Sequence, residues 1–241
     1  MKNFELIPFA NADELVRAVA GKWLDEIESA NRAGKRHCVA LSGGRITRKF
    51  FAVTAEQAKA RAVSFATVHF FWADERCVPP DDLESNYRMA NGLLFAPLKI
   101  PEGRIHRIHG ELPPEAAAAR ATSELAEIAD LNPSSQPVLD LIFLGMGEDG
   151  HVASLFPDEI EAASSDQAVY RAVKNSPKPP PNRVTLGYAA IAAARQVWVL
   201  ISGVGKKAAL RNSLHANGRT PLARVAQFRT QTRIFSDFQL V

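Results

Sequence analysis

The sequence predicts a doubly wound α/β protein, in which one mostly parallel sheet carries helices on both faces. Short runs of apolar and β-branched residues alternate along the chain with longer stretches whose apolar residues recur at helical spacing. The chain has 241 residues, of which 46% are hydrophobic and 23% charged, enough to build one full-sized core. No repeat or linker divides it, so we expect a single domain over residues 1–241.

The first helix is predicted over residues 12–30, where apolar side chains recur every three or four positions and Asn11 precedes them as an N-cap. Strands are predicted as short apolar runs at residues 37–41, 68–72, 138–144 and 196–201. The last two hardly alternate between apolar and polar residues, which is typical of strands covered on both faces.

Further helices are predicted at residues 115–129, which follow two prolines, and at residues 206–214. A third begins after Ser85, a residue type that favours the N-cap position. Residues 176–182, SPKPPPN, hold too much proline for regular structure, and we expect a loop there.

Composition and charge exclude several classes of protein. Lys and Arg number 29 against 26 Asp and Glu, and this balance of +3 is too small and too evenly spread for a nucleic-acid surface. Cys38 and Cys77 form neither a disulfide framework nor a zinc motif. The sequence offers no other metal ligand set, and we expect neither a metal nor a cofactor. Apolar runs are too short to span a bilayer, and Glu5, Asp13 and Glu14 interrupt any signal peptide. We expect a cytoplasmic monomer without nucleic-acid or membrane partners.

Four segments with glycines or charged residues follow predicted strands, and ligand-binding loops gather at that end of an open parallel sheet. The first is Ser42, Gly43, Gly44 and Arg45, after the strand at residues 37–41. Two glycines and the amides that open a following helix would suit a phosphate. A simple chain turn is the alternative, because the segment lacks both the Walker lysine and the dinucleotide fingerprint.

The second segment places Asp74, Glu75 and Arg76 directly after the strand at residues 68–72. Charged side chains at the end of a buried strand need partners, because an unpaired buried charge is costly. They either face a polar cleft or form a salt-bridge cluster at the surface, and both readings stay open at this point.

The third segment, LDLIFLGMGEDGHVASLFP at residues 139–157, carries Glu148, Asp149 and His151 on a glycine-rich turn. A neutral imidazole can take a proton from water near neutral pH, so this group of residues indicates a general base. A lone histidine is more often structural, but the glycines and the acidic neighbours favour function here.

The fourth segment combines Arg183 with Lys206, which lies in another strand, glycine turn and helix sequence. A lysine at a helix start conflicts with the helix dipole, and an anionic ligand would remove the conflict. A solvated lysine is the alternative.

Together these segments resemble the 6-phosphogluconolactonase family, which belongs to a larger group with glucosamine-6-phosphate deaminases and a ribose-phosphate-isomerase-like fold. The pieces that carry the resemblance are LSGGR at 41–45, WADER at 72–76, SNY at 85–87, LGMGEDGHVASLFP at 144–157, RVTL at 183–186 and GVGK at 203–206. The chain departs from the family in the first piece, which many members continue as SGGSTP or GGRTP. Here Ile46, Thr47 and Arg48 follow Arg45, so the proline is missing.

The resemblance implies hydrolysis of 6-phospho-D-glucono-1,5-lactone to 6-phosphogluconate, a step of the oxidative pentose phosphate pathway. It implies that His151 is the catalytic base, with Asp149 beside it. It also implies that the phosphate and the sugar are held by Ser42, Gly43, Gly44, Arg45, Asp74, Arg76, Arg183 and Lys206. No serine nucleophile is expected, because Ser42 and Ser154 lack the GxSxG elbow.

Two alternatives remain open from the sequence. One is an aminosugar-phosphate deaminase and isomerase, whose members typically read MDEY where this chain has residues 73–76 and IAFNEP where it has VASLFP. Both differences favour hydrolysis. The other is a sugar-phosphate sensor that does no chemistry, which would have no need of a base on the His151 turn.

Overall fold

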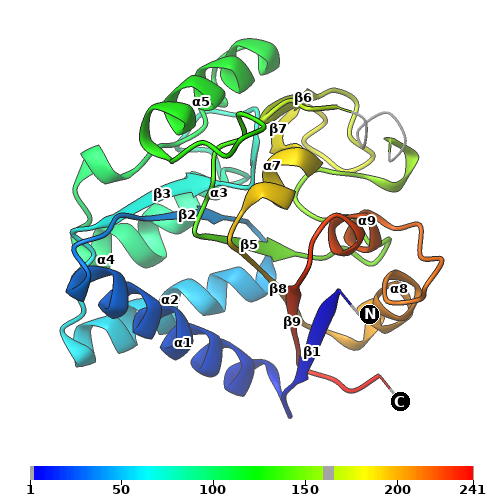
Figure 1. The fold of residues 1–241 in the computed structure, drawn as a ribbon, viewed down its shortest axis with the longest axis horizontal. Coiled ribbons are helices and arrows are strands. Elements are labelled where there is room, and N and C mark those ends of the chain that lie inside the picture. The colour runs from blue at the N-terminus through cyan, green and yellow to red at the C-terminus, as the bar shows by residue number, and fades with distance from the viewer. Residues whose placement is uncertain (1–2, 160–165, 241) are drawn as a thin grey trace.

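The structure, a computed structural model, describes residues 3–159 and 166–240. Two sheets form its centre (Figure 1). The larger sheet has six strands, and every neighbouring pair in it is parallel. Its strands, in spatial order, are β1 (Phe4–Pro8), β9 (Thr232–Ser236), β8 (Gln196–Ile201), β5 (Leu141–Gly145), β2 (His37–Leu41) and β3 (Val68–Trp72).

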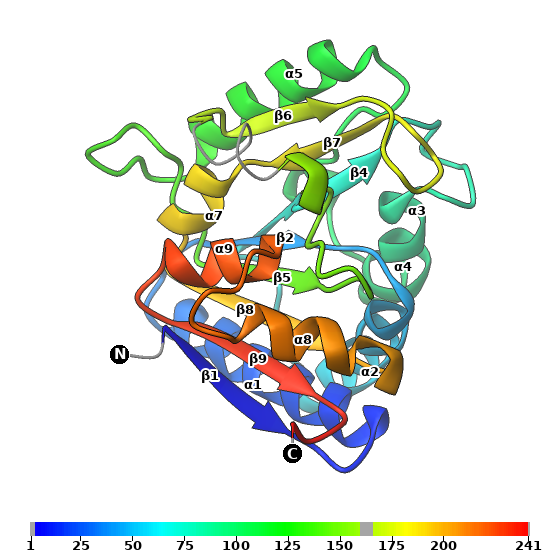
Figure 2. The same cartoon turned by 90° about the vertical axis from the view of Figure 1, so that its right-hand side faces the viewer.

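Helices cover both faces of this sheet, which confirms the predicted fold class (Figures 1 and 2). One face carries α1 (Ala12–Arg32) and α2 (Arg45–Arg61), which pack against each other. The opposite face carries α7 (Tyr188–Ala193), α8 (Lys207–Ser213) and α9 (Pro221–Gln227). β2 and β3 are buried along their whole length, as strands between two helical layers must be.

The smaller sheet is antiparallel and consists of β4 (Asp74–Arg76), β7 (Arg183–Leu186) and β6 (Tyr170–Val173). Helix α5 (Pro114–Ile128) packs on it. Only Ala73 separates β3 from β4, so the chain passes directly from the large sheet into the small one. Three short elements follow β4, namely α3 (Asn86–Ala90), a π-helical turn (Asn91–Phe95) and α4 (Ala96–Leu98).

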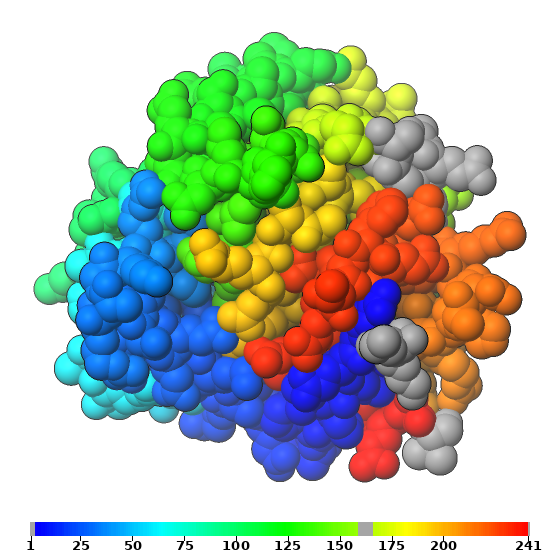
Figure 3. Space-filling model, in the orientation of Figure 1, coloured from blue at the N-terminus to red at the C-terminus, as the bar shows by residue number. Residues whose placement is uncertain are grey.

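The two ends of the chain meet at the edge of the large sheet. β1 pairs with β9 in parallel, from Phe4 beside Thr232 to Pro8 beside Ser236. Figure 3 shows the corresponding blue and red segments side by side at the surface. No helix among the described residues is both long and apolar enough to cross a membrane.

Aromatic packing holds α1 and α2 against the sheet. Asn11 caps α1, since its side chain accepts a hydrogen bond of 2.9 Å from the backbone of Glu14, as the sequence predicts. Trp23 of α1 is fully buried, and its ring lies 5.1 Å from that of Phe143 on β5 and 5.8 Å from that of Phe50 on α2. These contacts fix the start of α2 relative to the ends of β2 and β5.

Two predicted boundaries are wrong, one by three residues and the other by one. The strand predicted at 138–144 begins only at Leu141, because Val138 instead donates its backbone hydrogen bond to the carbonyl of Asp130, outside the sheet. The helix predicted at 206–214 begins as a 3-10 turn (Val204–Lys206), and α8 proper starts at Lys207. The predicted loop at 176–182 is confirmed.

A chain of hydrogen bonds joins β3 to α5 away from the sheet ends. Arg104 donates to Nε2 of His69, so the proton of this neutral imidazole lies on Nδ1 and is donated over 2.9 Å to Nε2 of His106. His106 in turn donates from Nδ1 to Glu124 over 2.9 Å. Every imidazole nitrogen is used once, and this pattern requires both rings to be neutral.

We expect this chain of hydrogen bonds to make stability fall in mild acid. Burial, with smaller effects from Arg104 and His106, lowers the pKa of His69 to about 4, so between its ordinary pKa and that value the unfolded chain binds the proton and the folded chain does not. Lowering the pH from about 7.5 to 5 should therefore decrease the free energy of unfolding by about 1–2 kcal/mol through His69. Urea titrations of wild type and His69→Gln at both pH values would measure it, and an unchanged pH dependence in the variant would contradict it.

Candidate active site

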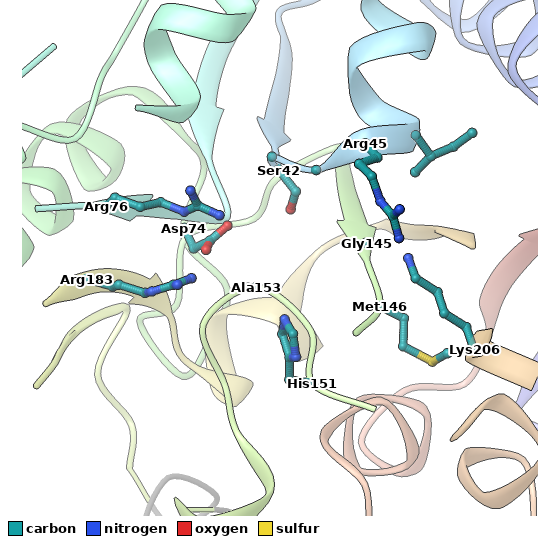
Figure 4. A pocket seen from close by; sticks show the side chains of 13 residues that line it. Ser42, Arg45, Asp74, Arg76, Gly145, Met146, His151, Ala153, Arg183 and Lys206 are labelled. Atoms are coloured by element: carbon teal, nitrogen blue, oxygen red, sulfur yellow. The ribbon is translucent and has the colours of Figure 1, made fainter. Parts of the chain in front are cut away.

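A pocket opens where β2, β3, β5 and β8 end and the small sheet begins. Its lining consists of Ser42, Gly43, Gly44, Arg45, Ile46, Asp74, Arg76, Gly145, Met146, His151, Ala153, Arg183 and Lys206 (Figure 4). All four segments singled out in the sequence therefore meet in one hollow. Of the residues predicted for the site, only Asp149 is absent from the lining, and it contacts His151 directly.

The turn after β5 fixes the imidazole of His151. Gly147 donates its backbone N–H to the carbonyl of His151 over 2.9 Å, and a Cβ at Gly147 would lie 2.1 Å from Nδ1, so only glycine fits. Oδ1 of Asp149 accepts the backbone N–H of His151 over 3.2 Å and its Nδ1–H over 2.5 Å. Because a carboxylate can only accept, the imidazole proton lies on Nδ1, and Nε2 keeps its lone pair.

The charge states of this pair suit proton transfer. Burial lowers the pKa of His151 below its ordinary value, although hydrogen bonding and the charge of Asp149 act in the opposite direction. Burial alone would raise the pKa of Asp149, but the hydrogen bonds from His151 and Lys178 outweigh it and lower that pKa to about 2. At neutral pH the pair is therefore a neutral imidazole held by a carboxylate.

Residues that follow His151 build the wall behind it. The ring of Phe156 lies 5.0 Å from the imidazole, and the Arg183 guanidinium lies 5.7 Å from the same ring. Ser154 is fully buried, and its hydroxyl donates to Oδ2 of Asp74 over 2.7 Å and accepts from Nη1 of Arg183 over 3.3 Å. The VASLFP sequence thus links His151 to two other pocket residues.

One end of the pocket carries two cations that lack a carboxylate partner. The side chains of Arg45 and Lys206 point toward one another there (Figure 4). Among residues 3–159 and 166–240 no carboxylate lies within ion-pair distance of either. Burial, and then the charge of Arg45, lowers the pKa of Lys206. Helix α2 begins at this point with no side-chain cap and no acidic residue in its first turn, so the whole end favours an anion.

The opposite end is nearly balanced in charge. Nη1 of Arg76 donates to the carbonyl of Glu84 over 3.0 Å and lies 3.3 Å from its carboxylate. Arg183 is 3% exposed, and it donates to the carbonyls of residues 178, 179 and 180 over 3.0–3.1 Å. Asp74 lies between the two guanidinium groups (Figure 4). This end offers hydrogen bonds without a large excess of positive charge.

Strand alternation answers the question that the sequence left open for residues 74–76. Asp74 and Arg76 face the pocket, whereas Glu75 points the other way and is 2% exposed. Its carboxylate accepts hydrogen bonds from three backbone N–H groups and from the hydroxyl of Ser85, which caps α3 as predicted. Burial raises the pKa of Glu75 to about 7, even though the three N–H donors favour the charged form. Glu75 therefore anchors the turn that begins α3.

That turn holds Asn86 against Gly43. The Asn86 carboxamide donates to the carbonyl of Asp74 over 2.9 Å, and its Oδ1 would lie 2.0 Å from a Cβ at Gly43. The glycine is therefore required by the close approach of α3 to the loop after β2. Ser42 ties the same loop to β5, since its hydroxyl donates to the carbonyl of Phe143 over 2.8 Å.

We expect Gly43→Ala to lower kcat/KM by about 10–100-fold and the unfolding free energy by about 1–3 kcal/mol, because the new methyl group must displace Asn86 and the loop. The double variant Gly43→Ala with Asn86→Ala removes the clashing carboxamide and should recover part of both losses. Gly92→Ala is the control, since a Cβ there has no neighbour within 4 Å. Full activity in Gly43→Ala alone would show that this contact is unimportant.

Several site residues were not predicted from the sequence. Asn86 and Phe156 lie inside quoted motifs, but nothing in the sequence shows what they touch. Lys178 carries no signal beyond its place in a proline-rich loop, yet its ammonium group contacts Asp149. Arg48, one of the residues at which the chain departs from the family, is exposed on α2 and does not line the pocket. The described residues contain no cluster of three or more His, Cys, Asp or Glu that could hold a metal ion.

The chain is similar to known proteins over most of its length. The model of the family described as glucosamine-6-phosphate isomerases/6-phosphogluconolactonase matches residues 10–234. The 6-phosphogluconolactonase of Mycobacterium tuberculosis is 36% identical over 202 residues, which cover 82% of this chain and 81% of that protein. That of Streptomyces coelicolor is 32% identical over 220 residues, 89% of this chain and 84% of that one.

Solved structures agree with this result. The crystal structure of a 6-phosphogluconolactonase from Thermotoga maritima is 32% identical to this chain, with a TM-score of 0.78 over 97% of this chain and 98% of that one. The likeness thus extends over nearly the whole chain. The chain belongs to the family of glucosamine-6-phosphate isomerases and 6-phosphogluconolactonases.

Proposed function

We propose that this protein hydrolyses 6-phospho-D-glucono-1,5-lactone to 6-phosphogluconate, with a water molecule activated by His151. The observation that carries the proposal is the position of a neutral imidazole, with Nε2 free, between a cation pair that lacks carboxylates and a wall of hydrogen-bonding groups. The relatives named 6-phosphogluconolactonase support the choice of substrate.

The charge distribution favours one orientation of the substrate. The phosphate would lie between Arg45 and Lys206, beside the loop of Gly43 and Gly44, because among the described residues that end of the pocket has uncompensated positive charge. The lactone ring would then extend past His151, with its hydroxyl groups toward Asp74 and Arg76. Binding energy from the remote phosphate would hold the reacting carbon in place.

The reaction is acyl transfer to water. Nε2 of His151 takes a proton as the water oxygen bonds to C1, and the carbonyl electrons move onto its oxygen, near the guanidinium groups of Arg76 and Arg183. When the carbonyl re-forms, the bond from C1 to the ring oxygen breaks, and that oxygen receives the proton from Nε2. The new carboxylic acid then loses its proton to solvent. Asp149 keeps its hydrogen bond to Nδ1–H throughout and stabilises the transient imidazolium.

The proposal is tested by adding the purified protein to freshly made lactone and following its loss by NMR against the spontaneous rate. Catalysed loss, with no ammonia released from glucosamine 6-phosphate, is the expected result. Ammonia release would favour a deaminase, and binding of 6-phosphogluconate without lactone turnover would favour a sensor.

We further propose that one chain is sufficient for this activity, as a single-domain monomer. One hydrophobic cluster runs through both sheets, as in a single domain, and the residues of this chain already supply the base and the cations of the pocket. Light scattering of the active protein tests this, and a mass of twice 26.3 kDa would contradict it.

A further inference from the structure

A lysine outside the pocket lining contacts both members of the proposed catalytic pair. Nζ of Lys178 lies 3.2 Å from Oδ2 of Asp149 and 3.2 Å from Nδ1 of His151. Asp149 therefore uses one carboxylate oxygen for His151 and the other for Lys178. Since Nδ1 already donates its proton to Asp149, the approach of the ammonium group to the ring is a contact of charge, without a hydrogen bond.

The backbone of Lys178 is fixed from inside the protein. Its carbonyl accepts from Nη2 of the buried Arg183 over 3.0 Å and from the hydroxyl of Ser176 over 2.9 Å. Its N–H donates to the same hydroxyl over 3.2 Å. An ordinary surface ion pair loses much of its value to side-chain freedom. Here the side chain, which is 43% exposed, starts from a backbone attached to a buried pocket residue, and its ammonium group contacts both members of the pair.

We propose that Lys178 is a positioning residue for His151, which holds Asp149 in the orientation that receives Nδ1–H and whose positive charge disfavours the imidazolium at rest. The inference rests on the proposed function of His151 as a base. It assigns a role to the SPKPPPN loop that the mechanism above does not use.

The charges around His151 make the expected effect of removing Lys178 clear. Asp149 and Asp74 both favour the protonated ring, whereas Lys178 opposes it. Burial in the pocket wall, with the ring of Phe156 on one side, also opposes it. Without Lys178 the two carboxylates act with less opposition, so protonation of the ring becomes easier.

The test compares Lys178→Met, which removes the charge, with Lys178→Arg, which keeps it. Lys174→Met is the matched control, because Lys174 is exposed in the same connection between β6 and β7 and forms an ion pair with Glu115 at 2.6 Å. The measurements are kcat and KM for the lactone across pH, and the pH titration of the labelled His151 imidazole by NMR in the ligand-free protein.

In Lys178→Met, the titration midpoint of His151 and the acid limb of kcat/KM should both move up by about half to one pH unit. In the same variant kcat on the alkaline plateau should fall by about tenfold, with KM within about threefold of wild type. In Lys178→Arg the titration midpoint of His151 should lie close to that of wild type. Lys174→Met should match wild type in midpoint, kcat and KM.

An unchanged midpoint and kcat in Lys178→Met would overturn the inference while the lactonase activity stands. A rise in KM alone would also overturn it, because that result indicates that Lys178 binds the substrate. The NMR titration requires no turnover. A wild type without lactonase activity would therefore refute the proposed function, and the midpoint shift would still decide whether Lys178 controls the ring.

Discussion

Replacing His151 with glutamine is expected to lower kcat for lactone hydrolysis by about 10²–10⁴-fold, the usual contribution of a general base. Glutamine keeps a polar side chain of similar reach but cannot take a proton from water. The imidazole does not contribute to the phosphate end of the pocket, so KM should change little. Steady-state kinetics, corrected for spontaneous hydrolysis of the lactone, measure both kcat and KM.

The pH profile of the wild type gives an independent check on the same residue. The base works only as neutral imidazole, so activity should fall as pH drops through the pKa of His151, which burial places below its ordinary value. Activity should therefore persist below about pH 6.5, and this acid limb should be absent from the residual activity of His151→Gln. His215→Gln, at an exposed position, is the control. Near-normal turnover in His151→Gln would eliminate the assignment.

Replacing Lys206 with methionine is expected to lower kcat/KM for the phosphorylated lactone by about 10²–10³-fold, mainly through KM. Loss of a partly buried cation that faces a phosphate costs several kcal/mol, because the phosphate then lacks half of its charged contacts. The same variant should hydrolyse glucono-1,5-lactone, which has no phosphate, within about threefold of the wild-type rate. Parallel assays on the two lactones measure the difference.

Lys207→Met is the matched control for this prediction, since Lys207 begins α8 next to Lys206 but does not line the pocket. It should leave both activities unchanged. If Lys206→Met lowered kcat/KM equally for both lactones, Lys206 would contact the lactone ring or stabilise the fold, and the phosphate would have to lie elsewhere.

The fold could be predicted from the sequence because its strands are buried between helices. Residues 37–41 and 68–72 are short, mostly apolar runs, and their boundaries match β2 and β3. The small sheet could not be predicted in the same way. β4 has three residues, all charged, and becomes a strand only by pairing with β7, from Asp74 beside Thr185 to Arg76 beside Arg183. Pairing between distant segments leaves no local signal in such a short stretch.

The sequence singles out those candidate residues whose type alone suggests a chemistry. An imidazole on a glycine turn, or a cation next to glycines, suggests function even without knowledge of its contacts. His151, Arg45 and Lys206 do meet in one pocket. The supporting residues were missed because their roles depend on contacts. Glu75 resembles its pocket-facing neighbours in sequence, yet strand alternation buries it beneath α3. Lys178 contacts Asp149 from a loop whose backbone is bonded to Arg183.

The most direct test of the account is a crystal structure of His151→Gln with 6-phosphogluconate bound. It should show the phosphate between Arg45 and Lys206, and the C1 carboxylate within about 4 Å of the carboxamide that takes the place of the imidazole. A phosphate between Arg76 and Arg183, or a C1 carboxylate remote from that carboxamide, would contradict the proposed orientation and the role of His151 as the base.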